Sequence, residues 1–133
     1  MEENQKRSKT ESIKDYRIDT TDELSEKIAS ELKSVPPGKR GLLVIKGPNI
    51  GEKFFIDKKE SFIGRSPESD VLLDDITVSR KHVILKMEEK NCRLVDAGSL
   101  NGSYLNGNIV EEAVLQDGDR IQVGKYIFLF FQT

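Results

Sequence analysis

The chain has 133 residues, of which 36% are hydrophobic and 33% charged, and it carries a formal net charge of −2. This length allows one hydrophobic core with a tail, but not two cores. A slightly acidic chain lacks the basic face that nucleic-acid binding usually needs, so we expect no nucleic-acid partner. No apolar run reaches the roughly 18 residues of a membrane span, and no secretory signal is visible, so we expect a cytoplasmic protein that does not bind membranes.

Residues 1–40 have the composition of a tail. They contain no phenylalanine, mix acidic with basic side chains, and end in Pro36-Pro37-Gly38-Lys39-Arg40. Such segments cannot bury enough apolar surface to fold alone, and proline with glycine marks a linker. We therefore expect a disordered tail over residues 1–40.

A short helix is predicted inside this tail. Leu24, Ile28 and Leu32 recur every four residues, and Thr20 followed by an acidic residue three positions later fits a capping box. The pattern predicts a helix from about Thr21 to Ser34. A helix of this length is marginal in water and needs a packing partner to persist. The tail is therefore expected to be flexible and partly helical.

After Gly41, short apolar runs alternate with turn signals such as Asn-Gly, and all six phenylalanines lie in this part. Many short strands at such spacing predict an all-β fold, an antiparallel β-sandwich of about 10 or 11 strands over residues 41–133. No helix is expected within this domain. The expected strands cover residues 42–45, 53–56, 61–63, 71–73, 83–87, 93–95, 103–105, 120–123 and 126–131.

Cys92 is the only cysteine, and it lies in an apparent strand. A single cysteine forms neither an internal disulfide nor a metal site with four cysteine or histidine ligands. We interpret Cys92 as a small core residue, and we expect neither a metal ion nor a cofactor.

Three short polar clusters interrupt the strand pattern: Gly64-Arg65, Ser79-Arg80-Lys81-His82 and Asn101-Gly102. They supply a permanently charged guanidinium, a hydroxyl and a carboxamide. Together these groups suit a doubly charged phosphate and the peptide backbone beside it. The clusters therefore predict a phosphate-binding site on loops.

The ordered set Gly-Arg, Ser-x-x-His and Asn-Gly resembles the forkhead-associated (FHA) domain, a module that binds phosphothreonine peptides. The resemblance covers the chain from about Gly41 to the C-terminus. It implies the FHA β-sandwich over residues 41–133. It also implies that Arg65 is the main phosphate ligand, that Ser79 donates its hydroxyl to the phosphate, and that Asn101 contacts the ligand's main chain.

Other residues of these motifs are expected to support the site. Gly64 and Gly102 shape its turns, and by resemblance His82 braces the binding loops through hydrogen bonds rather than acting as a catalyst. Arg80 either contacts the ligand or is a solvated charge, and we count it with the binding residues. Asn106, in a second Asn-Gly pair, either reaches the ligand from the next loop or is an ordinary hairpin residue.

The tail offers an internal ligand, because the segment Asp19–Leu24 places two threonines in an acidic setting. Such a tail joined to one C-terminal FHA domain resembles the actinobacterial 2-oxoglutarate dehydrogenase inhibitors and glycogen accumulation regulators. In that subgroup a Ser/Thr protein kinase phosphorylates a tail threonine, the domain folds back onto it, and the protein stops engaging its target enzymes. The resemblance implies the same switch here, with 2-oxoglutarate dehydrogenase or glutamate-metabolism enzymes as partners.

Thr21 is the expected phosphorylation site, because Leu24 stands three positions after it, where FHA domains commonly read an aliphatic residue. Thr20 and Thr10 are the alternatives, and the tandem threonines also fit a plain helix cap. About twenty residues separate Thr21 from Gly41, which extend to roughly 66 Å. The domain is only about 30 Å across. The tail is therefore long enough to reach the domain's own site.

Two other functions were weighed against this regulator. An FHA adaptor would recruit phosphorylated partners in trans within Ser/Thr kinase signalling, and its activity would not need residues 1–40. An enzyme is the weakest interpretation, because no paired acid and base, metal-ligand cluster or phosphate-binding Gly-rich loop with Lys-Ser/Thr occurs. We expect a monomeric binding protein without enzymatic activity.

Overall fold

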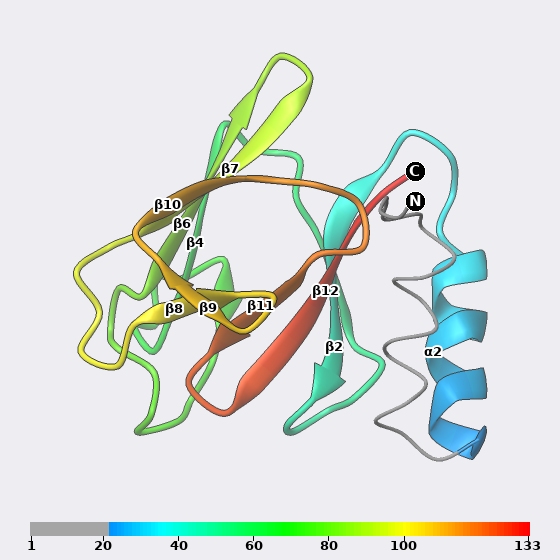
Figure 1. Cartoon of the computed structure of the whole chain (residues 1–133), viewed down its shortest axis with the longest axis horizontal. Coiled ribbons are helices and arrows are strands. Elements are labelled where there is room, and N and C mark those ends of the chain that lie inside the picture. The colour runs from blue at the N-terminus through cyan, green and yellow to red at the C-terminus, as the bar shows by residue number, and fades with distance from the viewer. Residues whose placement is uncertain (1–21) are drawn as a thin grey trace, which may run out of the picture.

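The structure, a computed structural model, describes residues 22–133. Within this range eleven strands form two sheets that pack face to face (Figure 1). The strands are β2 (Arg40–Lys46), β3 (Lys53–Phe55), β4 (Glu60–Gly64), β5 (Val71–Leu72), β6 (Val83–Glu88), β7 (Asn91–Asp96), β8 (Ser103–Leu105), β9 (Asn108–Val110), β10 (Glu112–Leu115), β11 (Arg120–Val123) and β12 (Tyr126–Gln132). The expected all-β sandwich is confirmed.

The five-stranded sheet has the order β10-β7-β6-β4-β5, and the six-stranded sheet has the order β3-β2-β12-β11-β8-β9. All pairings between these strands are antiparallel except the one between β4 and β5, which is parallel. The sequence analysis did not identify β9 and β10. Both are short and mostly exposed, so they lack the apolar alternation that marks a strand buried on one face.

The main core lies between the two sheets. Its largest fully buried side chains include Phe128 and Phe130 from β12, and Leu85 and Leu94 from the opposite sheet. Cys92 is part of this core, and burial raises the pKa of its thiol to about 11. The interpretation of this cysteine as a small core residue is confirmed.

A second, smaller core lies on the outer face of the six-stranded sheet, where helix α2 (Asp22–Lys33) packs (Figure 1). The predicted helix therefore exists, and the sheet is the packing partner that a short helix needs. Alternate residues of β2 and β12 point into the two cores. The outer core comprises Ile28, Val35, Leu43, Ile45, Leu129 and Phe131, with Leu24, Leu32 and Ile127 packed against it.

The segment after α2 is tied to the end of the chain. The Thr133 hydroxyl accepts a hydrogen bond from the Lys39 amide at 2.8 Å and donates to the Pro36 carbonyl at 2.8 Å. Val35 is buried in the outer core. The proline-glycine segment is thus held on the domain surface next to β12.

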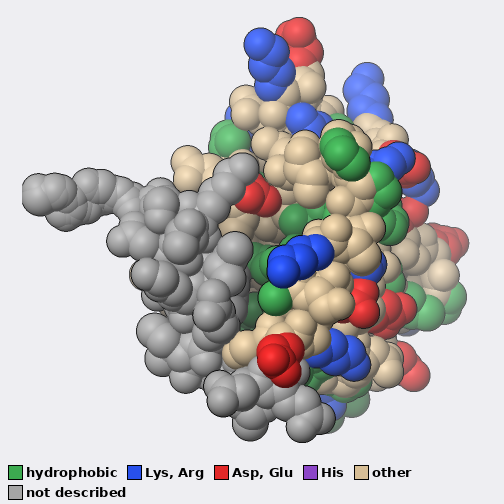
Figure 2. Space-filling view, turned by 90° about the vertical axis from the view of Figure 1, so that its right-hand side faces the viewer, with side chains coloured by type: hydrophobic (Ala, Val, Ile, Leu, Met, Phe, Trp, Pro, Cys, Tyr) green, Lys and Arg blue, Asp and Glu red, His purple; other side chains and the backbone are tan. Residues whose placement is uncertain are grey.

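Figure 2 faces the α2 side of the molecule and shows acidic and basic side chains interspersed on its described surface. This face therefore presents no large area of a single charge sign. No helix within residues 22–133 is long and apolar enough to cross a membrane.

Candidate functional site

Beyond the antiparallel pairing of β4 with β6, two backbone hydrogen bonds bring the first two polar clusters together. The Arg65 amide donates to the Ser79 carbonyl at 3.0 Å, and the Ser66 amide donates to the Arg80 carbonyl at 3.1 Å. A Cβ atom at Gly64 would overlap the Arg80 carbonyl and lie 3.1 Å from that of Ser79. Only glycine lets the two segments approach this closely.

Arg65 is exposed at the end of β4. Its Nε donates a hydrogen bond to the Val78 carbonyl at 3.1 Å, which fixes the direction of the guanidinium. Its two terminal nitrogens bond to no other group within residues 22–133. A fork held in this way presents parallel N–H donors of the kind that bind two phosphate oxygens at once.

Ser79 lies beside Arg65 and is oriented by two hydrogen bonds. Its amide donates to His82 Nδ1 at 3.0 Å, and its hydroxyl oxygen accepts from the Leu100 amide at 2.9 Å. An oxygen that accepts from an amide keeps its own proton to donate. Ser79 is therefore arranged as a hydroxyl donor next to the guanidinium.

His82 is fully buried and joins two loops. Because Nδ1 accepts from the Ser79 amide, the ring proton lies on Nε2, which donates to the Gly102 carbonyl at 2.8 Å. Both ring nitrogens are thus used within the fold. This geometry suits the bracing role that the sequence analysis expected and leaves no nitrogen for acid-base chemistry.

Asn101 and Thr77 connect the two loops a second time. Asn101 Nδ2 donates to the Thr77 carbonyl at 3.0 Å, and the Thr77 amide donates to Asp75 Oδ1 at 2.8 Å. The Lys125 amino group pairs with the other oxygen of Asp75 at 2.6 Å. Hydrogen bonds from Lys125 and Thr77 lower the pKa of Asp75 from 3.8 to about 2. The loop that carries Ser79 is therefore anchored to the turn between β11 and β12.

Asp96, at the end of β7, organises the loop that carries Asn101. Its carboxylate accepts from the hydroxyls of Ser99 at 2.6 Å and Ser103 at 2.5 Å, and from the amides of Gly98 and Ser99. Burial raises the pKa of Asp96, but these hydrogen bonds outweigh it and hold the pKa below its ordinary value. The Ser99 hydroxyl then accepts from the Gly102 amide at 2.9 Å.

The sequence analysis did not identify Asp75, Asp96 or Lys125 as parts of the site. The first two could have been suspected from the patterns Asp-x-Thr and Asp-x-x-Ser, which favour local side chain to backbone hydrogen bonds. Lys125 gave no such signal, because its partner is far away in the chain.

Asn106 occupies the turn between β8 and β9 with a positive φ of 50°. Its Nδ2 donates to Asp119 Oδ1 at 3.0 Å, and its Oδ1 accepts from the Arg120 amide at 2.9 Å. The side chain is thus occupied within the fold, which favours the hairpin interpretation. Contact with a ligand stays a prediction for this residue.

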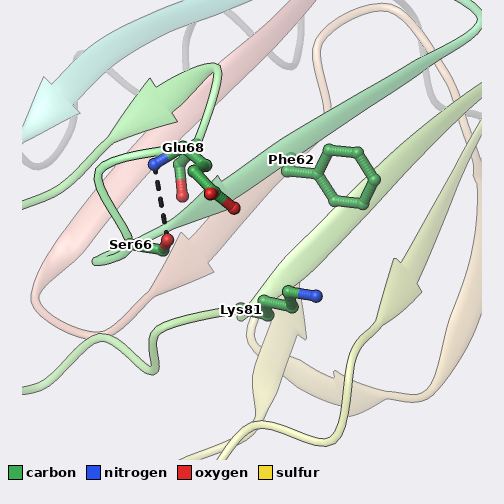
Figure 3. A pocket seen from close by; sticks show the side chains of 5 residues that line it. Phe62, Ser66, Glu68 and Lys81 are labelled. Atoms are coloured by element: carbon green, nitrogen blue, oxygen red, sulfur yellow. Dashed lines mark hydrogen bonds between the residues drawn. The ribbon is translucent and has the colours of Figure 1, made fainter.

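Arg80 is exposed, and its side chain bonds to no group within the described residues. Its neighbour Lys81 lines a hollow of about 150 Å³ together with Phe62, Ser66, Glu68 and Ser69. Figure 3 shows Lys81 and Glu68 reaching this hollow from separate segments, with the Phe62 ring beside it. Arg65, Ser79 and Asn101 do not line this hollow, so it does not place Lys81 in the candidate site.

Large apolar side chains are exposed on the same loops. Ile76 is 95% exposed and Leu100 is 89% exposed. Ile109 of β9 is 66% exposed and lies over Gly102. The loops of the candidate site thus carry the exposed Arg65 and Arg80 together with exposed apolar side chains. Thr10, Thr20 and Thr21 lie outside the described residues.

Solved FHA domains superpose on this structure. A structure reported under "Structural and functional analysis of phosphothreonine-dependent FHA domain interactions" superposes with a TM-score of 0.67 at 26% identity, covering 71% of this chain and 97% of that one. The FHA domain of an Arabidopsis thaliana protein gives 0.67 at 27% identity, covering 73% and 87%.

Sequence relatives agree with this fold. A family described as "Inner membrane component of T3SS, cytoplasmic domain" matches residues 43–133. The glycogen accumulation regulator GarA of Mycolicibacterium smegmatis is 40% identical, covering 86% of this chain and 77% of GarA. The oxoglutarate dehydrogenase inhibitor of Corynebacterium diphtheriae is 37% identical, covering 89% and 92%. The chain belongs to the GarA and oxoglutarate dehydrogenase inhibitor family of FHA proteins.

The resemblance inferred from the three polar clusters is thereby confirmed. This FHA protein is also 43% identical to GarA of Mycobacterium tuberculosis over 106 residues. It spans about 65% of the length of that relative.

Proposed function

We propose that this FHA protein binds phosphothreonine peptides and regulates a metabolic enzyme by direct contact. The observation that carries the proposal is the convergence of the Arg65 guanidinium, the Ser79 hydroxyl and the Asn101 carboxamide on loops that His82 holds together. A phosphate adds about −1.5 to −2 charges and three strong acceptor oxygens. A preformed fork and hydroxyl therefore favour a phosphorylated peptide over the unmodified one.

The proposed ligand is the protein's own tail after a Ser/Thr protein kinase has phosphorylated Thr21, with Thr20 and Thr10 as alternatives. The segment around the tandem threonines is acidic, and the exposed side chains of Arg65 and Arg80 are cationic. A tether raises the local peptide concentration to about the millimolar range. Self-binding then displaces any partner that needs the same loops.

The proposed partner is 2-oxoglutarate dehydrogenase, in keeping with the name of the Corynebacterium diphtheriae relative. An enzyme of glutamate metabolism is the alternative. In the unphosphorylated protein, the apolar side chains Ile76 and Leu100 are free to pack on such an enzyme. Phosphorylation covers them and ends the inhibition. We propose a cytoplasmic, monomeric regulator that is not itself an enzyme.

The site is tested by the affinity of Arg65→Ala for a synthetic peptide of residues 16–25 phosphorylated on Thr21. We expect at least a tenfold loss, because two charge-assisted hydrogen bonds disappear. Lys90→Ala is the matched control, since Lys90 is an exposed cation in the turn between β6 and β7. Unchanged affinity of Arg65→Ala, measured by titration calorimetry, would show that the site is assigned to the wrong residues.

The enzyme partner is tested separately. The full chain is expected to inhibit 2-oxoglutarate dehydrogenase before phosphorylation and not after it. A chain lacking residues 1–21 is expected to inhibit whether or not it has been treated with the kinase. If deletion of residues 1–21 did not change the inhibition measured with or without kinase treatment, the FHA adaptor that acts in trans would be the better interpretation.

A further inference from the structure

Helix α2 begins at Asp22, the residue directly after the proposed phosphorylation site, and α2 is fixed to the domain. Ile28 is 5% exposed in the outer core. The Lys53 amino group of β3 pairs with Glu31 and donates to the Ser34 hydroxyl at 2.9 Å. The Lys27 side chain lies over Gly51 in the turn between β2 and β3. Side chains from the middle and from the last turn of α2 are therefore in contact with the sheet or with the turn between β2 and β3.

This position is remote from the phosphate-binding loops. In the six-stranded sheet β12 and β11 separate β2 from β8. The loop that carries Leu100 and Asn101 leads into β8, and it meets Ser79 through the Leu100 amide. Three strand spacings give about 14 Å in the plane of the sheet, and α2 lies a further layer of roughly 10 Å outside it. Figure 1 shows α2 on one side of the sandwich, and β8 and β9 on the opposite side.

A phosphate on Thr21 cannot cross this distance while α2 stays in place. One residue adds at most about 3.6 Å of reach, and Thr20 adds as much again. The linker after α2 does not extend the reach of Thr21, because the docked helix fixes the chain at Asp22, directly after Thr21. Thr10 differs, since the dozen or so residues before Asp22 extend to roughly 40 Å.

We infer that docking of α2 and self-binding of the phosphorylated tandem threonines exclude each other. The inference rests on the proposed self-binding and adds its structural condition. Self-binding of the phosphorylated tail displaces α2 from β2 and β12. The apparent affinity of self-binding is lowered by the equilibrium constant for docking of α2, because only the undocked form can bind its own tail. Helix docking therefore sets the point at which the tail can compete with a partner enzyme for the site.

The test uses the full chain phosphorylated on Thr21, with the modified residue located by mass spectrometry. Two quantities are measured: amide hydrogen exchange of α2, and the apparent affinity for the phosphorylated peptide of residues 16–25 added in trans. Three proteins are compared: the wild type, Ile28→Asp, and Ser30→Asp. Ser30 is an exposed position of the same helix, so its variant has the same change in charge without losing buried surface.

In the wild type, we expect phosphorylation to remove the protection of the α2 amides. In Ile28→Asp, α2 is expected to be unprotected before phosphorylation. The phosphorylated variant should then bind the added peptide about tenfold more weakly than the phosphorylated wild type, because its own tail competes better. Ser30→Asp should match the wild type.

The inference would be overturned if the α2 amides stayed protected in a phosphorylated chain in which the Arg65 and Ser79 amides show that the site is occupied. Equal apparent affinities of phosphorylated wild type and Ile28→Asp would overturn it as well. The proposed function fails differently: the unphosphorylated proteins would then not bind the added peptide at all. Their binding also shows that Ile28→Asp leaves the domain folded.

Discussion

The carboxylate of Asp96 accepts four hydrogen bonds from Gly98, Ser99 and Ser103, which lie on both sides of the candidate ligand residue Asn101. None of these donors is a charged group of the three polar clusters. Asp96 therefore acts on ligand binding only through the position of the loop. Residues of this kind explain why a site made from a few short motifs needs a whole domain around it.

Asp96→Asn is expected to lower both stability and phosphopeptide affinity. The carboxamide nitrogen faces backbone amides that need an acceptor, which costs about 1–3 kcal/mol of unfolding free energy. Because folding lowers the pKa of Asp96, its contribution is complete above the unfolded value near 4 and is lost as the pH falls through the lower folded value. Urea unfolding of both proteins checks this.

The difference in unfolding free energy between wild type and Asp96→Asn should shrink as the pH falls from about 5 toward 3. Ser69→Asn, a change outside the Asp96 hydrogen bonds, is the control and should show no such convergence. A difference that stays constant over this range would mean that the Asp96 carboxylate does not titrate with folding.

His82 supports the site through its hydrogen bonds and the space that it fills, rather than through a charge. It is the sole histidine, and its two ring nitrogens connect Ser79 with Gly102, which lies 20 positions after His82. Replacement by alanine leaves the Ser79 amide and the Gly102 carbonyl without these partners and opens a cavity in a fully buried position. We expect a loss of about 3 kcal/mol in urea unfolding, with weaker peptide binding as a consequence.

The pairing of β4 with β6 connects the strand pattern to the site. Beyond the end of this pairing, the amides of Arg65 and Ser66 donate to the carbonyls of Ser79 and Arg80, so the two segments carry the guanidinium and the hydroxyl side by side. The closeness of these segments depends on the missing side chain at Gly64.

Gly64→Ala tests this dependence without removing any ligand group. The added methyl would meet the carbonyls of Arg80 and Ser79, so the segments must separate. We expect about 2 kcal/mol of destabilisation and at least a tenfold loss of phosphopeptide affinity. Gly98→Ala is a control for space, because nothing lies within 4 Å of its added Cβ, although its φ of 78° adds strain. If Gly64→Ala bound as the wild type does, the close approach would not matter for recognition.

Strands β2 and β12 read as continuous apolar runs because each lies between two cores. Leu42 and Phe128 face the opposite sheet, whereas Leu43 and Leu129 face α2. Covered on both sides, these strands have no need of polar alternation. The helix is thus a part of the folded protein and not merely a carrier of the phosphorylation site.

Truncation separates these two roles of the N-terminal region. Removal of residues 1–21 should leave the melting temperature unchanged, because the described contacts of α2 remain. Removal of residues 1–35 should lower it by roughly 10 °C or more and promote aggregation, because the outer apolar face of β2 and β12 becomes exposed. Calorimetry with light scattering measures both. Equal melting temperatures for the two truncations would show that α2 contributes nothing to stability.

Most strands, the helix and the three motifs of the site could be located from the amino-acid sequence. These features depend on neighbours along the chain: apolar alternation, the four-residue repeat of α2, and the backbone freedom of Asn-Gly and Gly-Arg. Because local chemistry encodes them, their positions could be predicted before any contact was known. The strands β9 and β10 were missed, since exposed strands carry little of that signal.

The tertiary structure alone decided what these elements contact. Leu100 meets the Ser79 hydroxyl across 21 positions, Asn101 meets Thr77 across 24, and Lys125 meets Thr77 across 48. It also decided that α2 packs on the outer face of β2 and β12. Such contacts depend on strand order and sheet packing, which no local pattern specifies. The motifs therefore identified the chemistry expected of the site, whereas the folding of distant loops onto one another produced its geometry.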